Sequence, residues 1–169
     1  MESTREIPMP TAVRVVNVIV AGLGGQGVLT ASDILADAAF RAGFDVKKSE
    51  IHGMSQRGGS VTSDVRFGKK VMSPMVPPGE ADFLLVLASD QVEPNRHHLR
   101  RGGVLITPET IDPSQLESAR SINVALLGVL SARMAEIPES AWIDALLAHL
   151  PEKLHDVNRR AFLLGRERK

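Results

Sequence analysis

Three glycines near the N-terminus form the first group of residues that could bind a ligand. Gly22, Gly24 and Gly27 are spaced as Gly-x-Gly-x-x-Gly and directly follow an apolar segment. Glycine lets the backbone approach a phosphate closely, and the first N–H groups of a following helix point at such an anion. The same spacing also serves close packing of a helix on a strand. The pattern therefore predicts either phosphate binding or packing alone.

A second group of candidates lies in the polar, glycine-rich segment 52–59. Its side chains include those of His52, Gln56 and Arg57. Arginine offers a fork of donors that fits phosphate or carboxylate, and glutamine adds neutral donors. We expect Gln56 and Arg57 to contact an anion or another protein chain, and the alternative is a solvated loop. His52 is the one candidate for acid–base catalysis, and a hydrogen-bonded structural imidazole is the other interpretation.

Charged residues between these two motifs allow further interpretations. Lys47 and Lys48 could reach phosphates, but lysines at the edge of a sheet are also used to prevent unwanted strand pairing. A dinucleotide site needs an acid about 20 residues after the glycine pattern to bind a ribose hydroxyl. Glu50 stands near that position. Its strand is short and weakly apolar, so a free-standing NAD-binding or other nucleotide-binding module, or a dehydrogenase, is the less favoured hypothesis.

The composition excludes several classes of function. The 169 residues include 20 basic and 20 acidic side chains, so no net charge favours a nucleic-acid or membrane partner. The absence of cysteine excludes disulfides, thiolate nucleophiles and cysteine-bound clusters. His97 and His98 are adjacent and face different ways on a helix, so we predict no metal site. No apolar run has the length of a membrane span. We expect a soluble, cytoplasmic protein.

The elements that must position these motifs alternate between strands and helices. An apolar strand at residues 14–21 precedes the glycine turn, and helical spacing of apolar residues follows it to residue 42, where Gly43 would end the helix. A short strand at 44–49 comes before the polar segment. Alternation at 60–67 predicts a strand that forms a β-hairpin with residues 71–73.

The second half of the chain continues the alternation. Its apolar runs predict two buried strands, and its helical spacing predicts four helices, while residues 111–118 are ambiguous. The expected strands cover residues 81–88 and 104–107, and the expected helices cover residues 89–99, 123–135, 138–150 and 153–166. This order predicts a three-layer α/β/α fold with a mixed, mostly parallel sheet, a Rossmann-like first βα unit and a β-hairpin. We expect a flexible leader at 1–12 and a single domain at 13–169.

Several motifs resemble the γ-type subunit of 2-oxoacid:ferredoxin oxidoreductases. The similarity extends over nearly the whole chain from Val15 onward, and the motif at 52–59 looks most like the small (β) subunit of the indolepyruvate enzyme. The segments that carry it are residues 22–28 (GLGGQGV), 49–61 (SEIHGMSQRGGSV), 65–68 (VRFG), 73–82 (SPMVPPGEAD), 123–128 (NVALLG) and 158–165 (NRRAFLLG).

The resemblance implies a subunit of an oxidoreductase that is inactive alone. In such complexes an arylpyruvate or other 2-oxoacid is oxidatively decarboxylated, the acyl group goes to coenzyme A, and electrons go to ferredoxin. The resemblance places thiamine diphosphate, Mg and the 4Fe–4S clusters on a large partner subunit. Without that partner, the chain is expected to form a homodimer through apolar surface.

The same resemblance makes coenzyme A the ligand expected at the two motifs. We predict that Gly24, Gly25, Gln26 and Gly27 contact it, followed by Gln56 and Arg57. These loops could equally form part of the interface with the large subunit.

Overall fold

The fold is built on one five-stranded sheet in the order β2-β3-β1-β4-β5. The structure is a computed structural model that describes residues 14–52 and 58–168, without the side chain of His52. Four strands point the same way, because β1 pairs in parallel with β4 and β4 with β5, while β3 is antiparallel to both β1 and β2. The strands are β1 (Val16–Leu23), β2 (Asp45–His52), β3 (Ser60–Gly68), β4 (Ala81–Val86) and β5 (Leu99–Ile106).

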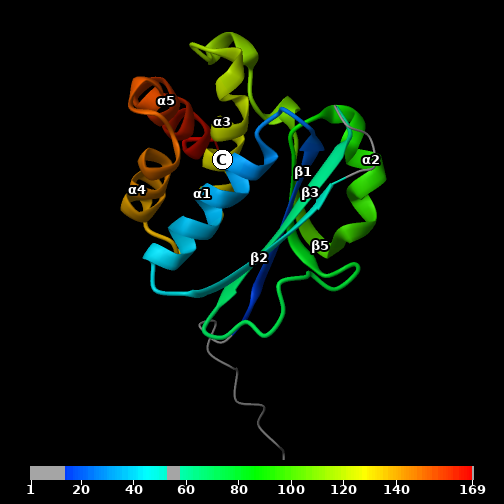
Figure 1. The fold of residues 1–169 in the computed structure, drawn as a ribbon. Coiled ribbons are helices and arrows are strands. Elements are labelled where there is room, and N and C mark those ends of the chain that lie inside the picture. Colours follow the sequence, from blue (N-terminus) through cyan, green and yellow to red (C-terminus); the bar gives the residue numbers. More distant parts are fainter. Residues whose placement is uncertain (1–13, 53–57, 169) are drawn as a thin grey trace, which may run out of the picture.

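The helices cover the two faces of the sheet unequally. Four longer helices lie on one face, and the short α2 lies on the other (Figure 1). The α-helices are α1 (Val28–Arg41), α2 (Val92–Asn95), α3 (Ile122–Ser131), α4 (Glu139–His149) and α5 (His155–Arg166). Single 3₁₀ turns are η2 (Ser89–Gln91), η3 (Arg96–His98), η4 (Pro108–Thr110), η5 (Pro113–Gln115), η6 (Ala119–Ser121) and η7 (Glu152–Leu154).

The main core lies between the sheet and the four longer helices. Its largest fully buried side chains include Phe67, Trp142 and Phe162. Two glycines let α3 and α5 meet at their backbones, because a Cβ added at Gly128 would lie 2.0 Å from the Phe162 carbonyl oxygen and one at Gly165 would lie 1.8 Å from that of Ala125. Helix α3 is thus packed on several sides, and nearly all of its residues are buried.

The opposite face of the sheet is covered by a thinner layer. A small buried cluster includes Ile19 and Leu84 from the sheet and Val76 from the loop after β3, and Val92 of α2 packs against it. The α/β fold class with a mixed sheet is confirmed. The second outer layer consists of a loop and one short helical segment rather than long helices.

The predicted hairpin partner of β3 was wrong. Residues 71–73 form no strand, because β3 already has β2 on one edge and β1 on the other. The N–H of Val71 instead donates to Asp45 Oδ2 at 2.7 Å, which ties the loop after β3 to the start of β2. The strand next to β3 in sequence that pairs with it in antiparallel fashion is therefore β2. β2 also extends beyond residue 49, where the sequence predicted its end, to His52.

Two other boundaries differ from the sequence-based expectation. The helix predicted at 89–99 is broken into η2, α2 and η3, because Pro94 lacks the N–H that a continuous helix needs. The glycines expected to precede the next strand lie inside β5, where the pairing register shifts between Ala81 and Phe83. Gly102 has φ 76° there, so the extra residues form a bulge. The predicted helix end at Gly43 is confirmed, since Gly43 has φ 95° and follows the C-cap Ala42.

The segment left ambiguous by its sequence contains one 3₁₀ turn. Pro113–Gln115 forms η5, and the Asp112 side chain caps it by accepting a hydrogen bond from the Ser114 N–H at 3.0 Å. The segment therefore contributes neither a strand nor an α-helix.

Candidate functional site

The glycine turn connects the end of β1 to the start of α1. Gly25 and Gly27 have φ of 86° and 85°, a backbone conformation that side chains with a Cβ adopt at a cost. Gln26 closes the turn twice, since its N–H donates to the Leu23 carbonyl at 3.2 Å and its Oε1 accepts from the Leu23 N–H at 2.7 Å. The side-chain oxygen of Gln26, predicted to contact a cofactor, is thus used by the turn itself.

Two glycines of the motif are also required for packing. A Cβ on Gly22 would lie 2.9 Å from Val28 Cγ2, and one on Gly27 would lie 2.3 Å from Asn123 Nδ2. The Asn123 amide donates to the Gly27 carbonyl at 3.4 Å, which links the turn to α3. The structure therefore shows close packing at Gly22 and Gly27, and anion binding remains a prediction.

The structure brings the two glycine-rich motifs into contact. The N–H of Gly24 donates to the Gly59 carbonyl at 2.9 Å, and a Cβ added at Gly24 would lie 3.5 Å from the Gly58 nitrogen. The end of the 52–59 segment therefore lies against the glycine turn. Gln56 and Arg57 themselves, like the side chain of His52, lie outside the described residues.

A cleft of ≈ 400 Å³ opens at this turn. Within the described residues, the N–H groups of Gly25 and Gly27 make no hydrogen bond, and Gly27 provides no side-chain cap for α1. The first N–H groups of any α-helix also lack partners inside the helix. The cleft is lined by Leu23, Gly24, Gly25, Gly27, Val28, Leu29, Thr30 and Val61. Free backbone donors and the positive end of a helix dipole make it suited to an anion.

Two residues of this site were missed by reasoning from sequence. Thr30 lines the cleft from the first turn of α1, and Asn123 supports the turn from a helix almost a hundred residues away. A hydroxyl in the third position of a helix after a glycine turn could have pointed to Thr30. Only the resemblance of the 123–128 motif could have pointed to Asn123, because nothing local connects it to the turn.

Lys48 and Glu50 of β2 have structural partners. Lys48 forms ion pairs with Asp33 of α1 and with Glu50, which attaches the edge strand to the helix. Burial acts to lower the pKa of Lys48, but hydrogen bonds and charge interactions with the two carboxylates outweigh it and raise that pKa. Lys48 is thus held by carboxylates, and Glu50 is engaged with a lysine.

The family of the chain follows from comparison with known proteins. Residues 17–168 match the family described as pyruvate ferredoxin/flavodoxin oxidoreductase. The chain belongs to this family. It is 47% identical to the indolepyruvate oxidoreductase subunit IorB of Pyrococcus horikoshii, in an alignment that covers 88% of this chain and 93% of that protein. Its homologues are subunits of oxidoreductases that act on 2-oxoacids.

Solved structures of the oxidoreductase family share the fold. The γ subunit of a keto/oxoacid ferredoxin oxidoreductase from Geobacter sulfurreducens matches with a TM-score of 0.77 and 25% identity, covering 90% of this chain and 97% of that one. A 2-oxoglutarate:ferredoxin oxidoreductase from Magnetococcus marinus also gives 0.77, at 21% identity, with 90% of this chain matching 30% of a longer one. That protein was solved with 2-oxoglutarate, coenzyme A and succinyl-CoA bound.

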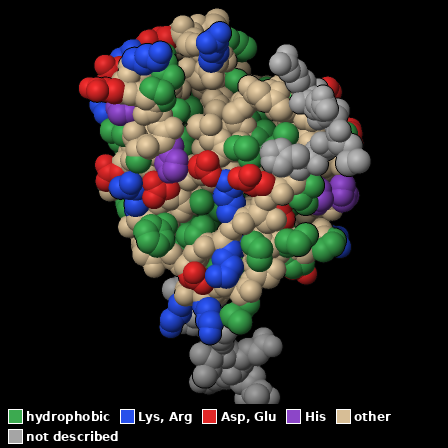
Figure 2. All heavy atoms as spheres, in the orientation of Figure 1, with side chains coloured by type: hydrophobic (Ala, Val, Ile, Leu, Met, Phe, Trp, Pro, Cys, Tyr) green, Lys and Arg blue, Asp and Glu red, His purple; other side chains and the backbone are tan. Residues whose placement is uncertain are grey.

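Among residues 14–52 and 58–168, no helix combines the length and apolar character needed to cross a bilayer. In the same part of the chain, no three side chains of histidine, aspartate or glutamate converge in a way that could hold a metal ion. Figure 2 shows basic and acidic side chains intermixed on the face that carries α1 and β2, in line with the balanced total charge.

Proposed function

We propose that this chain is the small subunit of a thiamine-dependent 2-oxoacid:ferredoxin oxidoreductase of the indolepyruvate type. The complex would oxidatively decarboxylate an arylpyruvate to an acyl-CoA, and this chain would shape the active site and help bind coenzyme A. The observation that carries the proposal is the cleft at the glycine turn in a chain of this family, where the N–H groups of Gly25 and Gly27 make no hydrogen bond to any described residue. The bound coenzyme A of the Magnetococcus marinus enzyme supports the choice of ligand.

The residues of the cleft fit a phosphate group of coenzyme A. The N–H groups of Gly25 and Gly27 and the hydroxyl of Thr30 supply donors around the positive end of α1. Gln26 would act by holding the turn in shape, and Gly24 by joining the turn to Gly59. When bound, coenzyme A accepts the acyl group as a thioester. Gln56 and Arg57 remain proposed contacts of coenzyme A.

The redox groups are assigned to a partner chain because this chain offers few ligands for them. The sequence contains no cysteine, which the usual ligation of a 4Fe–4S cluster requires. The described residues also lack a cluster of acidic and histidine side chains for the Mg that accompanies thiamine diphosphate. We therefore place both cofactors, and the delivery of electrons to ferredoxin, on the large subunit.

Exposed apolar side chains provide candidate contacts for the large subunit. Phe40, Ile51, Met72 and Met75 are 69%, 51%, 80% and 54% exposed. Methionine is common at surfaces that bind other proteins because its side chain adapts its shape. In the isolated chain the same side chains would support self-association. Sedimentation of the chain alone and with its partner tests this, since complex formation should replace the homodimer.

The coenzyme A contact is tested with two matched glycine substitutions in the purified complex. Gly25 and Gly43 lie at opposite ends of α1, both have positive φ, and neither would place a Cβ within 4 Å of another atom. Gly25→Ala and Gly43→Ala therefore impose the same kind of backbone strain, but only Gly25 lines the cleft. We expect Gly25→Ala to raise the KM for coenzyme A about tenfold, as the loss of a hydrogen bond to a charged group would.

The comparison of the two variants gives a clear decision. The assay follows acyl-CoA formation from arylpyruvates with a low-potential electron acceptor, and Gly43→Ala should leave the KM for coenzyme A unchanged. An equal change in both variants would show that the turn does not touch coenzyme A. Failure of the chain to form any complex with a large subunit would contradict the wider proposal.

A further inference from the structure

A second cavity lies at the opposite end of β1 from the glycine turn. Its volume is ≈ 570 Å³, within the range of roughly 300–1,000 Å³ that is typical of sites for small molecules. β1 spans eight residues, so the two sites are separated by about 25 Å at the usual rise of a strand. The cavity is lined by Arg14, Val16, Phe44, Phe67, Gly68, Asp82, Phe83, Arg100, Val104 and Glu136.

The body of this cavity is apolar and partly aromatic. Phe44 and Phe67 contact each other with ring centroids 5.3 Å apart, and Phe67 is fully buried. Phe83 and Val104 come from paired positions of β4 and β5. These side chains are fixed in the sheet and its core, so the cavity is formed in advance and would exchange water for an apolar ligand at a gain.

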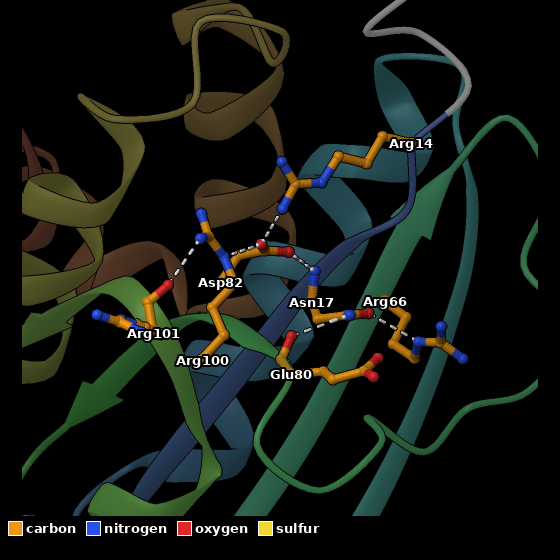
Figure 3. Close-up of polar contacts among 7 residues, drawn as sticks. All are labelled: Arg14, Asn17, Arg66, Glu80, Asp82, Arg100 and Arg101. Carbon is orange, nitrogen blue, oxygen red and sulfur yellow. Dashed lines mark hydrogen bonds and ion pairs between the residues drawn. The ribbon is translucent and has the colours of Figure 1, made fainter. Parts of the chain in front are cut away.

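The polar part of the cavity is organised by one buried carboxylate. Asp82 is 6% exposed, and its Oδ1 accepts from the guanidinium groups of both Arg14 and Arg100, the latter at 2.7 Å. Its Oδ2 accepts from the Asn17 N–H at 2.8 Å. Arg100 Nη1 also donates to the Arg101 carbonyl at 3.1 Å. Figure 3 shows the two guanidinium groups on either side of Asp82.

The hydrogen-bonding capacity left in this cluster consists of donors. Each guanidinium has five N–H groups, and the contacts of Arg14 and Arg100 among the described residues use only some of them. Asp82 already accepts three hydrogen bonds. The side chains of Arg14 and Arg100 remain 61% and 40% exposed, so both can be reached from solvent. Among the described residues, the acidic side chains that line the cavity are those of Asp82 and Glu136, and Glu136 is exposed in the turn between α3 and α4.

We propose that this cavity binds a small molecule with an apolar body and one carboxylate. The apolar body would lie against Phe44 and Phe83, and the carboxylate would bind the donors of Arg14 and Arg100 that no described residue uses. Asp82 positions the two guanidinium groups, so the arginine side chains lose less conformational entropy when a ligand binds. This site is separate from the coenzyme A site proposed above and does not depend on it.

The test measures binding of 4-phenylbutyrate to the full chain by calorimetry, with 4-phenylbutanol as a neutral comparison. Arg100→Gln and Arg101→Gln remove the same charge from neighbouring positions of β5, but only Arg100 lines the cavity. The side chain of Arg101 points away from Asp82 (Figure 3). Glu136→Gln removes the opposing negative charge. We expect saturable binding with one site, weakened about tenfold by Arg100→Gln, unchanged by Arg101→Gln and strengthened about twofold by Glu136→Gln.

Each other outcome overturns the proposal. Equal affinity for the acid and the alcohol would show that the arginines do not select a carboxylate. A reversed pattern, with binding strengthened by Arg100→Gln and weakened by Glu136→Gln, would assign the cavity to a cation. Absence of saturable binding by the full chain, or its loss in the complex with the large subunit, would assign the cavity to a protein segment instead.

Discussion

The two candidate sites at the ends of β1 are built from different chemical groups, backbone N–H groups at one end and side chains at the other. At its C-terminal end, the glycine turn offers backbone N–H groups of Gly25 and Gly27 above the start of α1. At its N-terminal end, two arginines and Asp82 surround an apolar cavity. The first site depends on backbone conformations that glycine permits, and the second depends on side chains brought together from separate segments. A substitution should therefore damage the first through strain and the second through unpaired polar groups.

The largest effect is expected from placing a side chain inside the glycine turn. Gly27→Ala adds a Cβ at φ 85° and only 2.3 Å from Asn123 Nδ2. The conformation costs about 1–2 kcal/mol and the overlap a similar amount, so the free energy of unfolding should fall by about 3 kcal/mol. Urea denaturation of the wild type and the variant measures this difference in the free energy of unfolding.

The contribution of the overlap can be separated from that of the backbone. In an Asn123→Ala background, Gly27→Ala should cost only the conformational part, about 1–2 kcal/mol. Gly43→Ala measures the same conformational cost directly, because no atom lies within 4 Å of the added Cβ. Strictly additive effects of Gly27→Ala and Asn123→Ala would mean that Asn123 does not constrain the turn.

Removing the central carboxylate of the other end should have the next largest effect. Asp82→Ala leaves the Asn17 N–H in a buried position without its acceptor and two guanidinium groups without their shared partner. An unsatisfied buried donor costs about 1–3 kcal/mol, so we expect a loss of about 2 kcal/mol of stability in urea denaturation.

A neighbouring acid provides the control for Asp82. The Glu80 side chain is exposed, and the hydrogen bonds of this residue are made by its backbone. Its carbonyl oxygen accepts from Asn17 Nδ2 at 3.2 Å, and its N–H donates to the Pro77 carbonyl at 3.1 Å. Glu80→Ala should change stability by less than about 0.5 kcal/mol. Comparable losses in the two variants would show that general negative charge, and not the bonds of Asp82, stabilises this end.

The contrast between the two ends also explains what the sequence could predict. The glycine turn is contiguous in sequence, so its spacing indicated a strand, a turn and a helix, and the structure has them at β1 and α1. Arg14, Asp82 and Arg100 come from three segments whose proximity depends on strand order, and no local pattern relates them. The order itself was mispredicted at β3, because alternation identifies a strand but does not name its partners.

The same reasoning applies inside the glycine-turn site. The sequence predicted that Gly24, Gly25, Gln26 and Gly27 contact a ligand, and this stays a prediction. It could not show that Gln26 folds back onto Leu23 or that Gly24 binds Gly59. Such bonds depend on rotamers and on a contact between two loops. The contribution of Gln56 and Arg57 stays a prediction.

A moderate effect is expected from the side chain that closes the glycine turn. Gln26→Ala leaves the Leu23 N–H without the acceptor now at 2.7 Å, which should cost about 1 kcal/mol in the free energy of unfolding. Gln26→Glu keeps an oxygen in that place but adds negative charge beside the cleft. It should therefore retain stability and still weaken coenzyme A binding in the complex. Weakened stability together with unchanged binding in Gln26→Glu would reverse this assignment.

The smallest effect is expected midway between the two ends, where Lys48 joins β2 to α1. Asp33 and Glu50 raise the pKa of Lys48 in the folded chain above its ordinary 10.5. The stabilisation of the fold by these ion pairs is therefore complete below about pH 10.5 and is lost as the pH rises through the higher pKa of Lys48 in the folded chain.

Ion pairs near the surface contribute little, so Lys48→Met should lower the free energy of unfolding by less than about 1 kcal/mol at pH 8 and low salt. Lys47→Met is the matched control, since Lys47 lies beside Lys48 on the opposite face of the strand. Urea denaturation from pH 8 to pH 11.5 should show a steeper decline in the wild type than in Lys48→Met, and identical slopes would mean that the carboxylates do not hold this lysine in solution.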